Sequence, residues 1–153
     1  VLPDASCLLG QKSTEYYQHL KTEKHERLLS IAILTEEING YSTNRLVSAA
    51  QSRGHQVTVL DPAQCYAEVS VSRMETRHHG AVLPHFDVVI PRFHRRIANY
   101  GLAVLRQIES HHIYPLNHSL SINNALDKLI GYQILSRGHI PMPTTAFGNS
   151  PDD

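Results

Sequence analysis

The chain has 153 residues, with 41% hydrophobic residues, 18% charged residues and a formal net charge of zero. These values are ordinary for a globular domain, and the zero net charge argues against nucleic acid or an anionic membrane surface as a direct partner. No apolar run approaches the roughly 20 residues that cross a bilayer, and no secretory signal is visible. Cys7 and Cys65 form no disulfide framework, so we expect a soluble protein of the reducing cytoplasm.

The first 28 residues are expected to form an extension or linker ahead of a folded domain that covers residues 29–153. Residues 1–11 show little pattern. Ser13–Arg27 is polar and has few large apolar side chains, which predicts no more than a marginal helix.

A β-α-β unit follows this extension. Leu28–Thr35 is an almost continuous apolar run, as is typical of a strand covered on both faces. Ser42 is the expected N-cap of a helix through Arg53, which Gly54 ends. Gln56–Leu60 is then a second strand, and the helical crossover requires that the two strands run parallel.

The middle of the chain predicts a small hairpin and a third buried strand. Val69–Thr76 and Ala81–Leu83 flank the turn-forming pair His79-Gly80, which favours a hairpin. Phe86–Pro91 is apolar and predicts the third strand of the main sheet.

A second helix is predicted over Asn99–His111, with leucines and an isoleucine on its inner face. Ile113–Leu116 is a short fourth strand. The next segment has the features of a capped helix, because Asn117 and Ser119 are suitable N-cap residues.

This third helix is expected to run without a break to Gly138, which we predict as a left-handed residue after its last turn. Its apolar residues recur near a 3.6-residue period and should pack inward: Ile122, Leu126, Leu129 and Ile130. Pro141 and Pro143 then prevent further helix, and Pro143–Phe147 is expected to be an extended strand.

The order β-α-β-β-α-β-α-β predicts an α/β fold that is Rossmann-like, with an open, mostly parallel sheet and helices on both faces. Ligands of such sheets bind beyond the carboxyl ends of the strands. The loops at which we expect a site are Glu36–Tyr41, Asp61–Gln64, Arg92–Arg96 and Asn117–Ser119.

Several residues in these loops have two interpretations, as part of a functional site or as ordinary surface residues. Glu36 and Glu37 are either paired carboxylates for acid–base work or a solvated pair, and the solvated pair is favoured. The cluster Arg92, Arg95 and Arg96 binds a phosphate or carboxylate, is a solvated loop, or contacts a neighbouring domain. No GxGxxG or GxxxxGK[ST] motif is present, which disfavours dinucleotide binding and a P-loop.

The histidine pairs and the cysteines give no stronger signal. His78-His79 and His111-His112 lack a third ligand at metal spacing, so no metal ligand is predicted. Neither cysteine lies in a nucleophile motif, and no catalytic residue is predicted within the chain. Lys128 beside Asp127 is by itself a solvent-facing pair, one turn or more inside the third helix.

A long collinear series of segments resembles the amino-terminal, pre-ATP-grasp domain of RimK-like ATP-grasp ligases. The segments extend from about Ile31 to Asp153: IAIL (31–34), AAQSRGH (49–55), LDP (60–62), LPHFDVVIPR (83–92), YGLAVLRQIE (100–109), YPLN (114–117), DKL (127–129), ILSRGHIPMPTT (134–145) and SPDD (150–153). RimK itself adds glutamate to the carboxyl terminus of a small-subunit ribosomal protein.

The resemblance implies a domain that precedes two ATP-grasp subdomains, which are absent here. In the full-length enzyme, ATP with Mg²⁺ or Mn²⁺ phosphorylates a carboxylate, and an amine attacks the acyl phosphate. Partners would be those subdomains, glutamate and a protein carboxyl terminus. Lys128 is the residue expected to approach the nucleotide phosphates, and Arg92 and Asn117 are candidates for substrate or interdomain contacts.

The chain departs from the family where the Pro-Arg pair is followed by Phe93-His94-Arg95-Arg96 in place of an aliphatic residue and glycine. This replaces the residue that permits close backbone approach to a ligand. Two hypotheses follow: a domain of an ATP-dependent ligase, inactive alone, or a standalone interaction or oligomerisation module of the same fold. The sequence leaves open which acid and amine are joined and whether protomers form a homo-oligomer.

Overall fold

The computed structural model describes residues 27–150, so the helix expected over Ser13–Arg27 and nearly all of the extension 1–28 lie outside the described residues. The described elements, in chain order, are β1 (Ser30–Leu34), α2 (Tyr41–Gln51), β2 (Gln56–Leu60), η1 (Pro62–Gln64), β3 (Cys65–Val69), β4 (Met74–His78), β5 (Ala81–Val82), β6 (Val88–Pro91), η2 (Arg95–Ile97), α3 (Ala98–Glu109), β7 (Tyr114–Pro115), α4 (Ser119–Leu126) and α5 (Lys128–Arg137).

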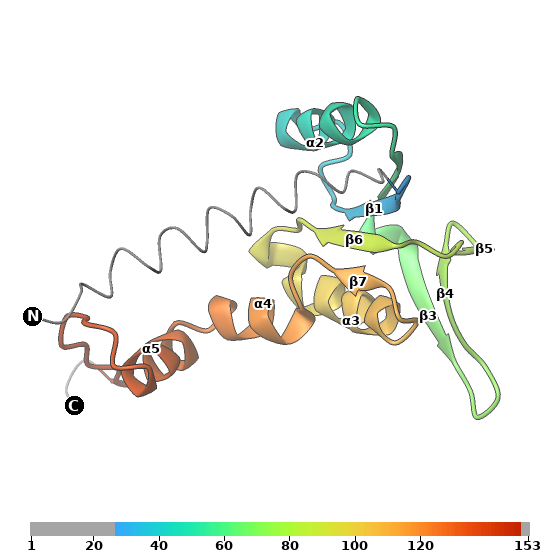
Figure 1. Cartoon of the computed structure of the whole chain (residues 1–153). Helices are drawn as coiled ribbons and strands as arrows, with labels where there is room; N and C mark the ends of the chain where they lie inside the picture. Colours follow the sequence, from blue (N-terminus) through green and yellow to red (C-terminus); the bar gives the residue numbers. More distant parts are fainter. Residues whose placement is uncertain (1–26, 151–153) are drawn as a thin grey trace, which may run out of the picture.

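The central sheet has four parallel strands in the order β2-β1-β6-β7. Strand β1 lies between two neighbours, so that Ile33 is opposite both Val59 and Ile90. Helices α2 and α3 cover opposite faces of this sheet (Figure 1). The predicted α/β fold, an open and mostly parallel sheet with helices on both faces, is confirmed.

The two faces of β1 explain its continuous apolar sequence. Ile31–Leu34 are all buried, and successive side chains of a strand point to opposite faces. Ala32 and Leu34 belong to the main core cluster, together with Leu105 and Ile108 of α3. The alternate residues, Ile31 and Ile33, therefore face the side that α2 covers. The continuous apolar run predicted a doubly covered strand for this reason.

A second, antiparallel sheet of order β3-β4-β5 interrupts the parallel one. The predicted hairpin around His79-Gly80 is confirmed, since both residues have positive φ angles (48° and 83°) between β4 and β5. Strand β3, however, was not predicted. The turn of residues 70–73 joins β3 to β4 and interrupts the strand expected over Val69–Thr76. It contains neither glycine nor proline, and its serines are weaker turn formers.

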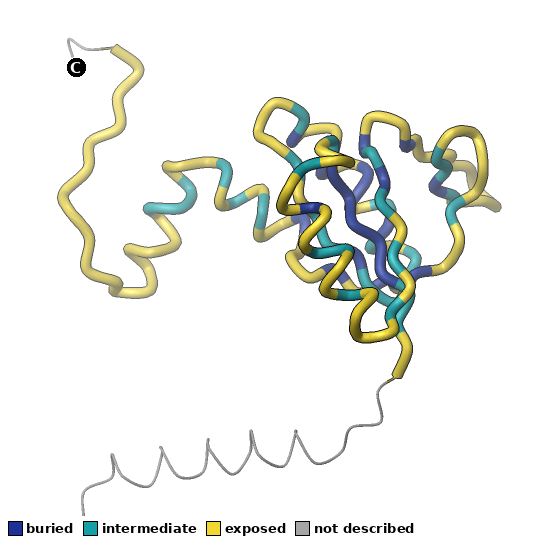
Figure 2. The backbone as a smooth tube through the Cα atoms, turned by 90° about the horizontal axis from the view of Figure 1, so that it is seen from above, coloured by how far each residue is buried: buried dark blue, intermediate teal, exposed yellow. Residues whose placement is uncertain are grey.

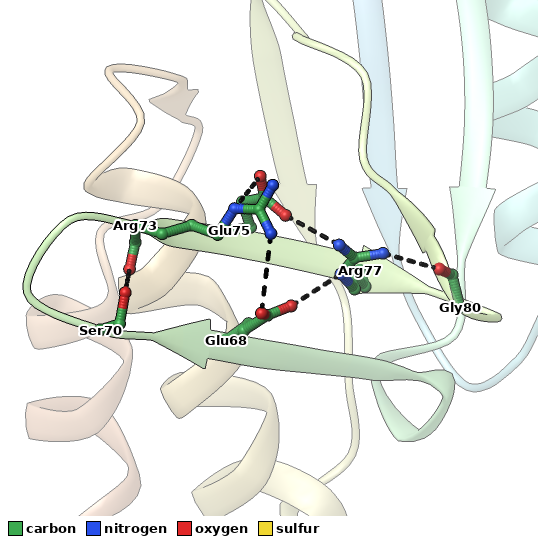
Figure 3. A network of polar contacts seen from close by, with 6 residues as sticks. All are labelled: Glu68, Ser70, Arg73, Glu75, Arg77 and Gly80. Carbon is green, nitrogen blue, oxygen red and sulfur yellow. Dashed lines mark hydrogen bonds and ion pairs between the residues drawn. The ribbon is translucent and has the colours of Figure 1, made fainter.

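The outer face of the small sheet is held together by charges (Figure 3). Arg77 donates to Glu68 at 2.9 Å, to Glu75 at 3.1 Å and to the Gly80 carbonyl oxygen at 3.1 Å. Arg73 forms a further ion pair with Glu75 at 3.0 Å. In this register Glu68 lies directly opposite Glu75. Arg77 pairs with both carboxylates, which offsets the repulsion between like charges on neighbouring strands.

The third helix differs from its prediction, because it is broken into α4 and α5 at Asp127. This residue has extended backbone angles (φ −92°, ψ 110°), and its side chain accepts a hydrogen bond from the Ile130 N–H at 3.0 Å. Aspartate competes with helical hydrogen bonding and is a good N-cap. Gly138 is the C-cap with φ −79°, and the left-handed residue is His139.

Two further expectations for this segment are wrong. Pro143–Phe147 joins no sheet. Helix α5 does not pack inward: it contacts α4, has no buried residue, and leaves Leu129 at 37% exposure. Only Ile122, on α4, packs against the core. Figure 2 shows the exposed α5 and the residues after it standing apart from the buried centre. Leu126 and Ile130 are partly buried, and Leu129 is exposed, so the predicted apolar face is covered only in part.

We predict that Leu105→Ala lowers the free energy of unfolding by about 2–5 kcal/mol, because it leaves a cavity in the core. Leu105 is fully buried. Urea unfolding of the 153-residue chain measures the effect. Leu120→Ala is the control, since Leu120 is 69% exposed and its loss should cost less than about 0.5 kcal/mol. Equal losses in both variants would contradict the packing described here.

Candidate functional site

The loops that follow β1 and β6 are tied together at the carboxyl edge of the sheet. The backbone N–H of His94 donates to both carboxylate oxygens of Glu36 at 3.2 Å, and its ring Nε2 lies 2.8 Å from Glu37 Oε1. Both carboxylates are therefore engaged by one residue. The alternative of a free carboxylate pair for acid–base chemistry is disfavoured by these contacts.

The charge of His94 follows from this arrangement. The hydrogen bond that the His94 ring donates to Glu37, and then the negative charges of Glu37 and Glu36, raise the pKa of His94 above its usual 6.5. Arg96 acts in the opposite direction more weakly. The loop is thus held by a charge-assisted contact that strengthens when the imidazole is protonated.

Phe93 anchors the same loop on its other side. A Cβ atom at Gly101 of α3 would lie 2.9 Å from Phe93 Cγ, so the ring rests directly on the helix backbone. Phe93 and His94 are two of the residues that depart from the family pattern. In this chain they connect the loop to α3 and to the β1 loop, respectively.

A hollow of about 530 Å³ lies between the start of α3 and the α4–α5 break. Its lining includes two cations, Arg95 and Lys128, and two amide side chains, Asn99 and Asn123. The one carboxylate in the lining, Asp127, accepts the Ile130 N–H. Both cations are exposed and neither forms an ion pair with a described residue. Unpaired cations around a concave surface suit an anionic ligand such as a phosphate.

Lys128 was predicted one turn or more inside a helix, which is wrong. It is the first residue of α5, because the chain starts a new helix at Asp127. Its ammonium group therefore belongs to a helix start, where free N–H groups also favour anions.

Arg92 and Asn117 lie on the same edge of the sheet but outside the hollow. Both are exposed; Arg92 directly follows β6, and Asn117 lies two residues after the end of β7. The N–H of Arg92 donates to the Leu34 carbonyl oxygen at 2.8 Å, which continues the sheet hydrogen bonding by one residue.

Arg95 was noted in the sequence only as part of a basic cluster. Asn99 and Asn123 gave no signal, since a polar residue on a helix is ordinary.

Glu109, at the end of α3, fixes the position of α4. Its carboxylate accepts hydrogen bonds from Ser119 N–H and Ser119 Oγ, both at 2.7 Å. The observed N-cap, His118, makes no capping bond with its side chain, so neither Asn117 nor Ser119 is the cap that the sequence predicted. A carboxylate from another helix satisfies the first turn instead.

The described residues contain neither a metal-ligating group nor a membrane-spanning helix. Within residues 27–150, no group of three His, Cys, Asp or Glu side chains is arranged to hold a metal ion. The rings of His78 and His79 lie edge to face, 4.2 Å apart. No described helix has both the length and the apolar character required to cross a bilayer.

Residues 29–122 match the family model described as the RimK PreATP-grasp domain. Curated relatives called "Probable alpha-L-glutamate ligase" are 49% identical over 125 residues in Halorhodospira halophila and in Klebsiella pneumoniae, and 46% identical in Hydrogenovibrio crunogenus. The match covers 82% of this chain but only 41–42% of each relative. The chain therefore spans about two fifths of the length of these relatives.

A solved structure shares the fold at much lower sequence identity. The ATP-grasp ligase PsnB, in complex with its precursor peptide PsnA2 and AMPPNP, aligns with a TM-score of 0.55 and 14% identity. The alignment covers 80% of this chain and 48% of that chain.

We predict that Glu37→Gln lowers the pKa of His94, because it removes the charged acceptor that favours the imidazolium. The stabilisation from this contact is complete below about pH 6.5 and disappears as pH rises through the higher folded-state pKa. An NMR titration of the His94 ring measures the change. Glu36→Gln is the matched control and should lower the pKa less, and equal shifts would contradict the direct contact with Glu37.

Proposed function

Because this chain belongs to the family of RimK pre-ATP-grasp domains, we propose that it is the amino-terminal domain of an ATP-dependent ligase that adds glutamate to a protein carboxyl terminus. The observation that carries the proposal is the 46–49% identity over 125 residues to probable alpha-L-glutamate ligases. That identity covers about two fifths of each relative, so the remaining three fifths would contain the ATP-grasp subdomains.

In this proposal the reaction has two steps. The γ-phosphoryl group of ATP passes to the acceptor carboxylate, which yields an acyl phosphate and ADP. The amine of glutamate then attacks the acyl carbon, an amide bond forms, and inorganic phosphate leaves. Mg²⁺ or Mn²⁺ would neutralise phosphate charge. The residues that bind the metal would come from the subdomains, since the described part of this chain has no such group.

Residues at the carboxyl edge would serve the nucleotide and the joining of domains. We propose that Lys128 approaches the nucleotide phosphates, as the family resemblance implies. The support is that Lys128 is the first residue of α5 and lines the same hollow as Arg95. Neither cation forms an ion pair with a described residue. Arg92 and Asn117, exposed after β6 and β7, would contact the substrate or the neighbouring subdomain.

The exposed apolar residues of α5 and the following segment support an interdomain role. Leu129, Ile134, Leu135, Ile140 and Phe147 are 37–66% exposed. Large apolar side chains left exposed over one segment suit an interface with another domain. We propose that the ATP-grasp subdomains cover it, and that the domain is inactive without them. The acceptor would be the carboxyl terminus of a small-subunit ribosomal protein, modified in the cytoplasm.

The alternative of a standalone interaction module has less support. It shares the fold, but it does not account for the collinear similarity to a group of ligases that extends through the Asp127–Leu129 segment. The exposed α5 is compatible with either reading. The similarity to ligases therefore favours the proposed function, whereas the exposed surface of α5 does not distinguish the two hypotheses.

The direct test is mass spectrometry of a candidate acceptor after incubation with ATP, Mg²⁺ and glutamate. We expect a longer protein carrying this domain ahead of ATP-grasp subdomains to add mass in steps of one glutamate residue. The chain of residues 1–153 alone should add none and release no ADP. ATP turnover by residues 1–153 alone would contradict the inactive-domain proposal. Failure of the longer protein with glutamate, but success with another amino acid, would overturn the proposed amine substrate.

For Lys128 we predict that Lys128→Ala in the longer protein raises the KM for ATP about tenfold, the usual effect of losing one charge-assisted contact. Lys128→Arg should retain most of the affinity, because it keeps the charge. Arg106→Ala removes an exposed cation of α3 that is not among the residues lining the hollow, and it should leave the KM unchanged. Initial rates at varied ATP concentration provide the measurement. An unaltered KM for Lys128→Ala would show that Lys128 is a solvated residue and does not contact ATP.

A further inference from the structure

A second concave site lies at the opposite edge of the sheet from Lys128. It has a volume of about 300 Å³ and is bounded by β4, by β5 with the segment after it, and by the end of α3. Leu83 and Pro84 precede β6, and Ile113 directly precedes β7. Because parallel strands share one direction, this pocket adjoins the amino ends of β6 and β7, while Lys128 is on the carboxyl side.

The pocket is lined by apolar walls and by buried polar atoms without partners. Apolar contact comes from residues such as Leu83, Ile108 and Ile113. Thr76, which is only 3% exposed, has its Oγ1 buried without a hydrogen-bond partner in the described chain, and the same is true of His111 Nε2. Both residues line the pocket. A buried hydroxyl with no partner is costly to the folded state.

Two further unpaired atoms lie on the same two parts of the chain. His78 Nε2 on β4 and Gln107 Nε2 on α3 are also buried without a partner among residues 27–150. Thr76 and His78 alternate along β4 and so share one face. Met74, on the same face, lies 3.8 Å from Ser110 Oγ, next to the end of α3. The inner face of β4 and the end of α3 therefore present hydrogen-bonding capacity that the fold does not use.

The charges around the pocket favour a neutral ligand. Glu75 lines it, but its carboxylate is paired with Arg73 at 3.0 Å and Arg77 at 3.1 Å. No lysine or arginine lines the pocket. The histidines of the lining, His85 and His111, are cations only when protonated. An anion would therefore meet a carboxylate and no permanent cation, and an ammonium group would find Glu75 already neutralised.

We propose that this pocket binds a small, neutral, apolar group that carries one hydroxyl, of the size of a phenol ring. Such a hydroxyl both donates and accepts, so it can pair with Thr76 Oγ1 and His111 Nε2 in either tautomer of the imidazole. The ring would replace water against Leu83, Ile108 and Ile113. The volume of about 300 Å³ is roughly twice that of a cavity that binds benzene, so it holds the ring and leaves room for atoms attached to it. The inference stands independently of the proposed ligase activity.

Two sources share this chemistry, a free phenolic compound and the tyrosine side chain of a peptide. The test uses p-cresol and N-acetyl-tyrosinamide as probes of the 153-residue chain, followed by NMR chemical-shift changes. We expect p-cresol to bind with a Kd on the order of millimolar, as a ligand of so few atoms allows. Tighter binding of N-acetyl-tyrosinamide than of p-cresol identifies a peptide side chain as the source, and the reverse order identifies a free compound.

Thr76→Val separates a binding role from a structural one. It should raise the midpoint of thermal unfolding by a few degrees, because a buried hydroxyl without a partner is removed. The same variant should weaken p-cresol binding about tenfold. Toluene, which lacks the hydroxyl, should bind wild type and Thr76→Val equally.

The proposal is overturned if neither phenolic probe binds the wild-type chain. It is also overturned if toluene binds the wild-type chain as tightly as p-cresol does, because the pocket would then recognise only apolar surface. A lower unfolding midpoint in Thr76→Val with unchanged p-cresol binding would assign Thr76 a packing role and contradict the proposed hydrogen bond. None of these readouts depends on ATP or on ligase activity.

Discussion

The burial of one face of α3 is the contact on which the remaining structure depends. Leu105 and Ile108 close the core beneath β1 and β6. At its start, Gly101 supports the Phe93 ring, and the Tyr100 hydroxyl donates to the Cys65 carbonyl oxygen of β3 at 2.7 Å. This helix therefore links the parallel sheet, the small antiparallel sheet and the loop after β6. A shift of α3 would disturb all three, because close-packed interiors transmit displacement.

The end of α3 also determines where the last two helices begin. The Glu109 carboxylate holds Ser119 at the first turn of α4, and Asp127 then starts α5 in a new direction. The hollow with Arg95 and Lys128 depends on both carboxylates, because Glu109 positions α4 and Asp127 starts α5. Its cations come from separate elements, η2 and α5, that meet only because α4 is anchored to α3.

The two edges of the sheet differ in chemistry. The carboxyl edge has exposed cations and a histidine whose pKa is raised by the Glu37 hydrogen bond. The pocket at the amino edge is lined by apolar groups and by buried polar atoms that lack partners. In a parallel sheet these edges are separated by the length of the strands. A ligand at one edge would thus leave the other edge free.

The amino-acid sequence by itself determined the parallel α/β architecture, because the continuous apolar run of β1 and the helical periods of α2 and α3 depend on local burial alone. Its long collinear resemblance also predicted the family. Only the tertiary structure decided that α5 is left without a covering element among the described residues, that His94 engages both Glu36 and Glu37, and that Thr76 lines a pocket with the end of α3. Each of these features depends on residues that lie far apart in the chain. The balance in each case is set by which groups the fold brings together, and no local pattern contains that information.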